Sequence, residues 1–179
     1  MALRKASAYS KKKTRPYTRK SKVKSKSYIK TVPQQKIVKF RMGALKDYES
    51  GRFKNIIKLV AGERVLIRDN ALEAARQTIH RILEKEMPGQ YYFEVKVFPH
   101  HILRENKVYS GSSKGERVNT GMALSFGSTT GRAAIVKPNQ TIFIAAVFHE
   151  KLKDVVTKAF ERAKAKVPCH ARIVFEKRK

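Results

Sequence analysis

The sequence predicts an α+β fold, an antiparallel sheet with two helices, which follows an extended basic N-terminal tail. Two long segments place apolar residues at helical spacing, and several short segments show strand periodicity or are rich in β-branched and aromatic residues. The first 46 residues carry 16 lysines and arginines before the first acid, Asp47. With 179 residues, of which 41% are hydrophobic, the chain is long enough for one core of ordinary size.

The basic start of the chain indicates both a boundary and a class of partner. Residues 1–35 are expected to form an extended tail that binds nucleic acid, because a basic run without acids repels itself and has too little apolar surface to fold alone. Residues 36–179 are expected to form a single α+β domain that also binds nucleic acid and begins with a strand at Lys36–Phe40. The formal net charge of +27 favours a nucleic acid partner, although charge says nothing about sequence preference.

Four β-rich runs follow this start. Asn55–Ala61 and Arg64–Ile67 are separated by Gly62-Glu63, which predicts a hairpin or a bend between two strands. Tyr91–Phe98 has the composition of a strand, and Ile102–Val108 is expected to be another.

A first long helix is predicted between two end signals. Asp69 or Asn70 can cap its N-terminus, and Pro88-Gly89 stops it. Arg76 and His80 fall on the flank of its polar face. The apolar face, which is expected to enter the core, consists of Leu72, Ala75, Ile79, Ile82 and Leu83.

The second half of the chain contains a long polar segment and then regular elements. Residues 109–132 are rich in glycine, serine, threonine and asparagine and are predicted to form a long functional loop. Ala133–Val136 and Thr141–Phe148 are expected to pair as a hairpin through Pro138-Asn139. A second helix is predicted for 150–166, and a last strand for 171–175. The apolar stripe of that helix is Leu152, Val155, Val156, Ala159, Phe160 and Ala163.

The residue types needed for catalysis or metal binding do not come together in a recognisable pattern. The glycine-rich segment lacks the phosphate-binding loop motif, and no nucleophile has a base and an orienting acid. His100 and His101 would point to opposite faces of a strand, and Cys169 is the single cysteine. We therefore expect no enzymatic activity, no cofactor, no metal site and no small-molecule substrate.

The sequence also predicts a location. It lacks a secretory signal and a run of about 18 apolar residues, so we expect a soluble protein that is not exported and has no membrane partner.

Two strings of residues are demanded by no helix, strand or simple turn: Arg104-Glu105-Asn106-Lys107, and Gly121-Met122 with Phe126-Gly127. Together with Asn70–Arg76 and Lys166-Val167-Pro168, in matching order and spacing from about residue 36 to 175, they resemble the archaeal and eukaryotic branch of the large-subunit ribosomal protein sixteen family, called ten-e in the older archaeal naming. Tyr17-Thr18-Arg19 in the tail is similar to this family too.

The resemblance implies an α/β hammerhead-like sandwich and a structural role in the large ribosomal subunit of the cytoplasm. Such a protein binds large-subunit rRNA beside the aminoacyl site and lies next to neighbouring large-subunit ribosomal proteins. Its long loop is directed toward the peptidyl transferase centre and helps to position A-site tRNA.

The candidate interface residues are mostly cations, because guanidinium and ammonium groups suit phosphates, and a tail tyrosine could stack on an unpaired base. The expected rRNA-binding residues are Arg4, Lys5, Arg15, Tyr17, Thr18, Arg19, Lys20, Lys36, Arg68, Arg76, Arg104, Lys107 and Arg132. The expected loop residues near tRNA and the peptidyl transferase centre are Ser110, Gly111, Ser112, Ser113, Lys114, Gly115, Glu116 and Arg117. The expected loop anchor is Gly121, Met122, Phe126 and Gly127.

Other interpretations stay open at this point. Arg76 could be a solvated charge on its helix, and Glu105 and Asn106 could brace the loop through hydrogen bonds. A general nucleic-acid compaction protein would use the same charge, and would bind duplex DNA as tightly as rRNA at matched salt. An RNA-modifying enzyme with a basic guide arm would lose turnover on rRNA when His100 is replaced by alanine.

Overall fold

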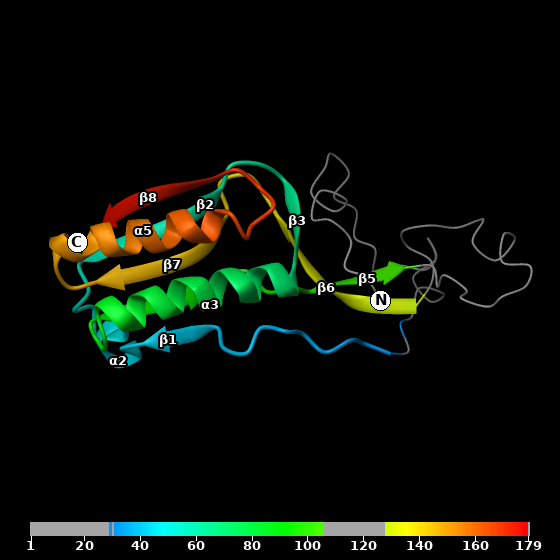
Figure 1. Ribbon diagram of the computed structural model, residues 1–179, viewed down its shortest axis with the longest axis horizontal. Coiled ribbons are helices and arrows are strands. Elements are labelled where there is room, and N and C mark those ends of the chain that lie inside the picture. The colour runs from blue at the N-terminus through cyan, green and yellow to red at the C-terminus, as the bar shows by residue number, and fades with distance from the viewer. Residues whose placement is uncertain (1–28, 30, 106–127, 179) are drawn as a thin grey trace, which may run out of the picture.

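Two antiparallel sheets and three α-helices make up the described part of the chain (Figure 1). The computed structural model describes Ile29, residues 31–105 and residues 128–178. The strands are β1 (Arg41–Gly43), β2 (Asn55–Ala61), β3 (Val65–Arg68), β4 (Tyr91–Val95), β5 (His101–Glu105), β6 (Ser128–Val136), β7 (Thr141–Val147) and β8 (Ala171–Lys177). The helices are α2 (Leu45–Glu49), α3 (Asp69–Glu86) and α5 (Lys153–Lys164), with a 3-10 turn at Glu150–Leu152.

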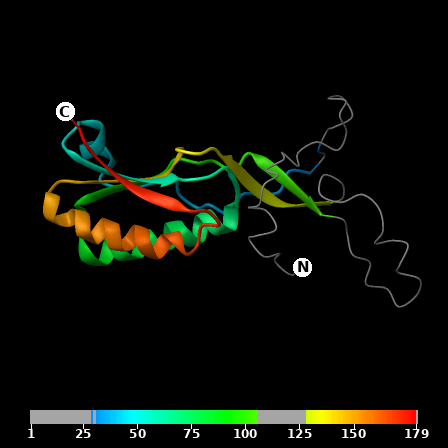
Figure 2. The ribbon, with the colours of Figure 1, turned by 90° about the horizontal axis from the view of Figure 1, so that it is seen from above.

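The larger sheet has the strand order β1-β4-β7-β2-β8, and α3 and α5 cover one of its faces (Figure 2). The smaller sheet has the order β3-β6-β5. Its β5 and β6 pair and extend away from the helices at one end of the molecule, and we call this pair the arm (Figure 1). The α+β class with antiparallel pairing is therefore confirmed.

The main core lies between the helices and the larger sheet. Fully buried side chains come from alternate positions of the strands, because successive side chains of a strand point to opposite faces. Ile57 and Leu59 of β2 and Phe143 of β7 meet Phe160 of α5 there. The apolar face predicted for the first helix is confirmed, since all five of its residues, Leu72, Ala75, Ile79, Ile82 and Leu83, are buried. In the second predicted helix Val156, Ala159, Phe160 and Ala163 are buried, whereas Leu152, in the 3-10 turn, and Val155 are partly buried against the core.

A smaller apolar cluster lies on the other face of the larger sheet. Tyr92 and Phe53 are buried there, and the ring of Tyr48 stacks on Tyr92 with 3.9 Å between the ring centroids. Tyr48 belongs to α2, a five-residue helix that the sequence did not predict, because it is too short to show helical periodicity.

The strand predicted at Lys36–Phe40 is wrong, since β1 begins at Arg41. The amides of Lys36 and Val38 do not join a sheet. They donate instead to the carboxylates of Asp69 (3.2 Å) and Glu73 (3.4 Å) on α3. Asp69 is also not an N-cap: it is the first residue of α3, and its Oδ1 accepts the amide of Asn70 at 2.8 Å.

The hairpin predicted at Pro138-Asn139 is wrong, and at Gly62-Glu63 the bend is confirmed, because each of these segments connects one sheet to the other. β2 pairs with β7 and β8, whereas β3 pairs with β6, so Gly62-Glu63 forms the bend rather than a hairpin turn. β6 and β7 do not pair either. The amide of Asn139, between β6 and β7, donates to the carbonyl of Ala61 at the end of β2, at 2.8 Å. The two connections between the sheets are therefore hydrogen-bonded to each other.

Several other boundaries shift by a few residues. The Tyr91–Phe98 run forms strand only to Val95, and the last strand continues to Lys177. The predicted loop is shorter at its C-terminal end than expected, because Ser128–Arg132 belong to β6. Predicted strand residues 106–108 lie outside the described residues.

Candidate nucleic-acid interface

The backbones of three of the predicted cations lie close to one another where α3 begins. Lys36 lies beside Asp69 through its backbone amide, Arg68 precedes α3, and Arg132 lies in β6, which pairs with β3. The Nε of Arg132 donates a 2.6 Å hydrogen bond to the carbonyl oxygen of Pro33. We call this group of Pro33, Lys36, Arg68, Asp69 and Arg132 the junction.

The junction connects the end of the predicted tail to the base of the arm. Ile37, which follows Lys36, is buried, so the segment is held by packing as well as by hydrogen bonds. Gly131 of β6 lies close to the start of α3, since a Cβ built at this glycine would be 3.9 Å from the Oδ1 of Asp69. The segment that leaves residue 31 toward the N-terminus therefore starts from a fixed place.

A buried ion pair continues this attachment along α3. Arg76 donates two hydrogen bonds to the carboxylate of Glu73, one from Nε at 2.8 Å and one from Nη2 at 2.6 Å. Its Nη1 lies 3.0 Å from the sulfur of Met42. Burial alone would raise the pKa of Glu73, but hydrogen bonds from Arg76 and Gln77 and the charge of Arg76 outweigh it and hold the pKa below its usual value. Glu73 is thus an ionised acceptor for the amide of Val38.

Two of the predicted RNA-binding arginines are less accessible than the sequence suggested. Arg76 is 9% exposed and Arg104 is 7% exposed. Arg76 holds Glu73, so its first role in the structure is to fix the N-terminal segment. Arg104 lies in β5 opposite Thr129, beside an irregularity in the strand pairing after Leu103.

The arm fixes both ends of the predicted loop. Glu105 is the pairing partner of Ser128, so the chain leaves and re-enters the sheet at neighbouring positions. The other predicted loop and tail residues lie outside the described residues. These are Arg4, Lys5, Arg15, Tyr17, Thr18, Arg19, Lys20, Lys107, Ser110 to Arg117, Gly121, Met122, Phe126 and Gly127.

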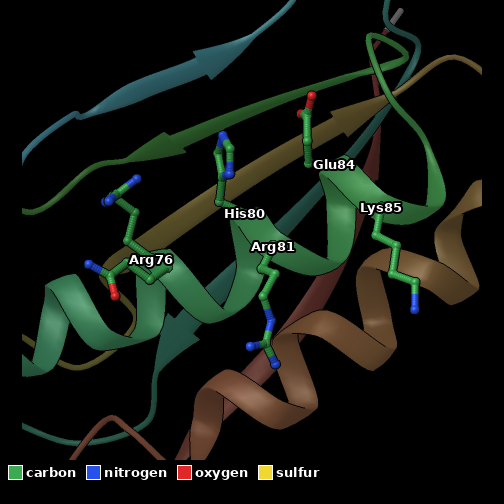
Figure 3. A pocket seen from close by; sticks show the side chains of 6 residues that line it. Arg76, His80, Arg81, Glu84 and Lys85 are labelled. Carbon is green, nitrogen blue, oxygen red and sulfur yellow. The ribbon is translucent and has the colours of Figure 1, made fainter.

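A shallow groove runs along the exposed side of α3 (Figure 3). Its lining residues are Arg76, Gln77, His80, Arg81, Glu84 and Lys85. One acid in this groove, Glu84, accepts a hydrogen bond of 2.5 Å from the hydroxyl of Tyr91. Arg81 and Lys85 were missed by the sequence reasoning, although their spacing of four residues on a predicted helix places them on one face.

Comparison with known proteins gives the assignment. The profile of the ribosomal protein L16p/L10e family matches residues 12–174. The chain belongs to this family. Large ribosomal subunit protein uL16 of Pyrobaculum islandicum is 40% identical over 177 residues, which cover 98% of this chain and 93% of that protein. The uL16 proteins of Thermofilum pendens and Methanococcus maripaludis are 39% and 38% identical, over 98% and 99% of this chain and 98% and 96% of their own lengths.

As a member of the L16p/L10e family, the chain is a structural ribosomal component and not an enzyme. Burial raises the pKa of the Cys169 thiol to about 11, with the charge of Glu63 adding to the effect, so the thiol stays protonated. Burial and Glu84 raise the pKa of Tyr91 far above its usual value.

Two kinds of feature are absent from the described part of this L16p/L10e chain. No group of three histidine, cysteine or acidic side chains there could hold a metal ion. No helix in the same residues is long and apolar enough to cross a membrane.

Proposed function

We propose that this L16p/L10e protein binds large-subunit rRNA near the aminoacyl site and helps to position A-site tRNA. In this proposal it works in the large ribosomal subunit of the cytoplasm, next to other large-subunit proteins. Its basic residues 1–35 lie along rRNA, and the loop at 109–132 is directed toward the peptidyl transferase centre.

The junction is the observation that carries the proposal. The hydrogen bond from Arg132 to Pro33 attaches the end of the tail to the base of the arm. The tail leaves from this attachment and the loop leaves from the far end of the same arm, so the two segments can contact two regions of RNA at a fixed separation. A protein that only neutralised charge would need no such geometry.

Crosslinking of the protein to RNA in growing cells, followed by sequencing of the attached fragments, tests the rRNA part of the proposal. We expect fragments concentrated in large-subunit rRNA around the aminoacyl site. Fragments dispersed over many RNAs and over DNA would instead support a general compaction protein. A competition assay between duplex DNA and rRNA at matched salt separates the same two functions.

Deletion of Ser110 to Gly115 tests the role of the loop. The deletion lies between Glu105 and Ser128, whose pairing closes the loop, so the fold and subunit assembly are expected to be kept. Accommodation of aminoacyl-tRNA or peptide transfer is expected to slow. A deleted form that assembles and elongates at the normal rate would contradict the loop assignment.

A further inference from the structure

The two faces of the larger sheet differ in how their cations are balanced. On the face away from α3 and α5, each charged side chain of the strands has a partner. Arg41 and Lys96 both contact Glu94, at 3.4 and 2.7 Å, and Lys58 contacts Glu176. These contacts lower the positive charge of that face without cancelling it, because three cations share two carboxylates.

The helix layer on the other face has cations without such partners. Arg81 and Lys85 of α3 and Arg162 of α5 are exposed and line one groove between the two helices, together with Ile82 and Glu86. Figure 3 shows Arg81 and Lys85 directed from α3 toward α5. Within the described residues, none of these three cations has an ion pair at 4.0 Å or less. We call Arg81, Lys85 and Arg162 the cationic seam.

The acids near the seam do not cancel it. Glu84 accepts the hydroxyl of Tyr91 at 2.5 Å, and Glu161 is paired with Lys164 at 2.6 Å. Glu86 is the acid in the groove, against three cations. Like charges held this close repel one another, so the seam is stabilised when an anion enters it.

We propose that the cationic seam binds the sugar–phosphate backbone of rRNA, at a surface separate from the junction. The inference rests on the proposed function, because it assumes that rRNA is the polyanion. Two of the three cations are arginines, whose planar guanidinium groups match the paired oxygens of a phosphate. The groove gives access from solvent to both helices at once. A run of phosphates can therefore contact α3 and α5 together.

The test compares two variants of the full chain that lose the same charge. The seam variant carries Arg81→Gln, Lys85→Gln and Arg162→Gln. The control variant carries Arg41→Gln, Lys46→Gln and Lys58→Gln, which lie on β1, α2 and β2, away from the helix layer. The probe is large-subunit rRNA transcribed in vitro, and the measured quantity is the slope of log binding constant against log salt concentration. A thermal melt of each variant monitors folding.

The expected result is a loss of salt dependence in the seam variant alone. Each phosphate contact contributes about 0.7 to 0.9 to the slope, so three lost contacts reduce it by roughly 2 to 3. The control variant keeps the slope of the unchanged protein. A charge-preserving variant with Arg81→Lys and Arg162→Lys, which retains the fold and the charge, keeps most of the slope as well.

Other outcomes would overturn the inference. Equal losses in the seam and control variants would mean that only net charge matters. An unchanged slope in the seam variant, with reduced incorporation into the subunit, would assign the seam to an acidic protein partner. The unchanged protein also tests the proposed function separately: equal affinity for duplex DNA and rRNA would contradict that function, whatever the seam variant does.

Discussion

The Nε of Arg132 donates a hydrogen bond of 2.6 Å to the carbonyl oxygen of Pro33, although the residues lie 99 positions apart in the chain. One residue belongs to β6 in the arm, and the other lies near the end of the basic tail. The half-buried setting of this bond strengthens it, because the donor is charged and water is partly excluded. The end of the tail is therefore attached to the base of the arm, whose far end, at Glu105 and Ser128, carries the loop.

Arg132→Gln is expected to loosen the segment around Pro33. A hydrogen bond from a charged donor is worth about 1.5 to 3 kcal/mol, so local opening should increase by about tenfold or more. Trypsin cleavage after Lys36, followed by mass spectrometry, measures this opening. Arg172→Gln removes an exposed arginine that bonds Asn139 and serves as the control. Equal cleavage rates in both variants would show that the Pro33 bond does not hold the segment.

Asp69→Ala should release the amide of Lys36. The carboxylate accepts from Lys36 and Asn70, and its loss leaves both donors without that acceptor, at a cost of about 1 to 3 kcal/mol of unfolding free energy. Hydrogen exchange at the Lys36 amide is expected to accelerate. The control is Asp154→Ala, an exposed acid in the first turn of α5. Unchanged exchange at Lys36 would contradict the role given to Asp69.

The Glu73–Arg76 pair predicts a pH dependence of stability. The pKa of Glu73 is lower in the folded protein, so its contribution is complete above the unfolded value of about 4.3 and is lost as the pH falls through the folded value. Glu73→Gln should cost roughly 3 kcal/mol at neutral pH, because it leaves a buried guanidinium unpaired.

Urea unfolding at a series of acidic pH values measures this effect. The stability difference between the unchanged protein and Glu73→Gln should shrink as the pH falls below about 4.3. Glu49→Gln, on the exposed surface of α2, should show a small difference that does not change with pH. A Glu73→Gln difference that stayed constant down to about pH 3 would rule out the ion pair as its source.

Gly43→Ala should destabilise the protein more than Gly89→Ala. Both glycines have positive φ, +88° and +71°, so each alanine carries a backbone cost of about 1 kcal/mol. At position 43 a Cβ would also lie 2.2 Å from the carbonyl oxygen of Tyr91, whereas nothing lies within 4 Å at position 89. Thermal melts compare the two directly. Equal shifts in melting temperature would mean that β1 can move away from β4 without cost.

The sequence predicted best those features that depend on local patterns. The apolar faces of α3 and α5 follow from helical spacing, and their ends follow from Pro88 and Pro168. The run Asn55–Ala61 was predicted with the bounds of β2. The pairing of strands was predicted less well. Pro138-Asn139 has the composition of a hairpin turn, but the amide of Asn139 donates to Ala61, which is distant in the sequence and shows no local signal of this contact.

In the candidate site, too, individual residues were predicted but their contacts with distant residues were not. Lys36, Arg68 and Arg132 were predicted as separate cations, and the pairing of β3 with β6 places Arg68 opposite Ala133, the neighbour of Arg132 in the chain. Arg76 was predicted on the flank of the polar face, but it is buried in an ion pair with Glu73, one turn earlier in α3. The seam was not predicted, because Arg162 is distant in sequence from Arg81 and Lys85.

The position of β2 in the larger sheet has a consequence for how the protein is made. β2 lies between β7 and β8, and its first residue, Asn55, pairs with Val147 on one side and Lys177 on the other. During synthesis from the N-terminus, this apolar strand therefore has no partner for one edge until β7 is made, and none for the other edge until β8 is made. An open edge of this kind can pair with another chain, so β2 is a site of aggregation risk in the nascent chain.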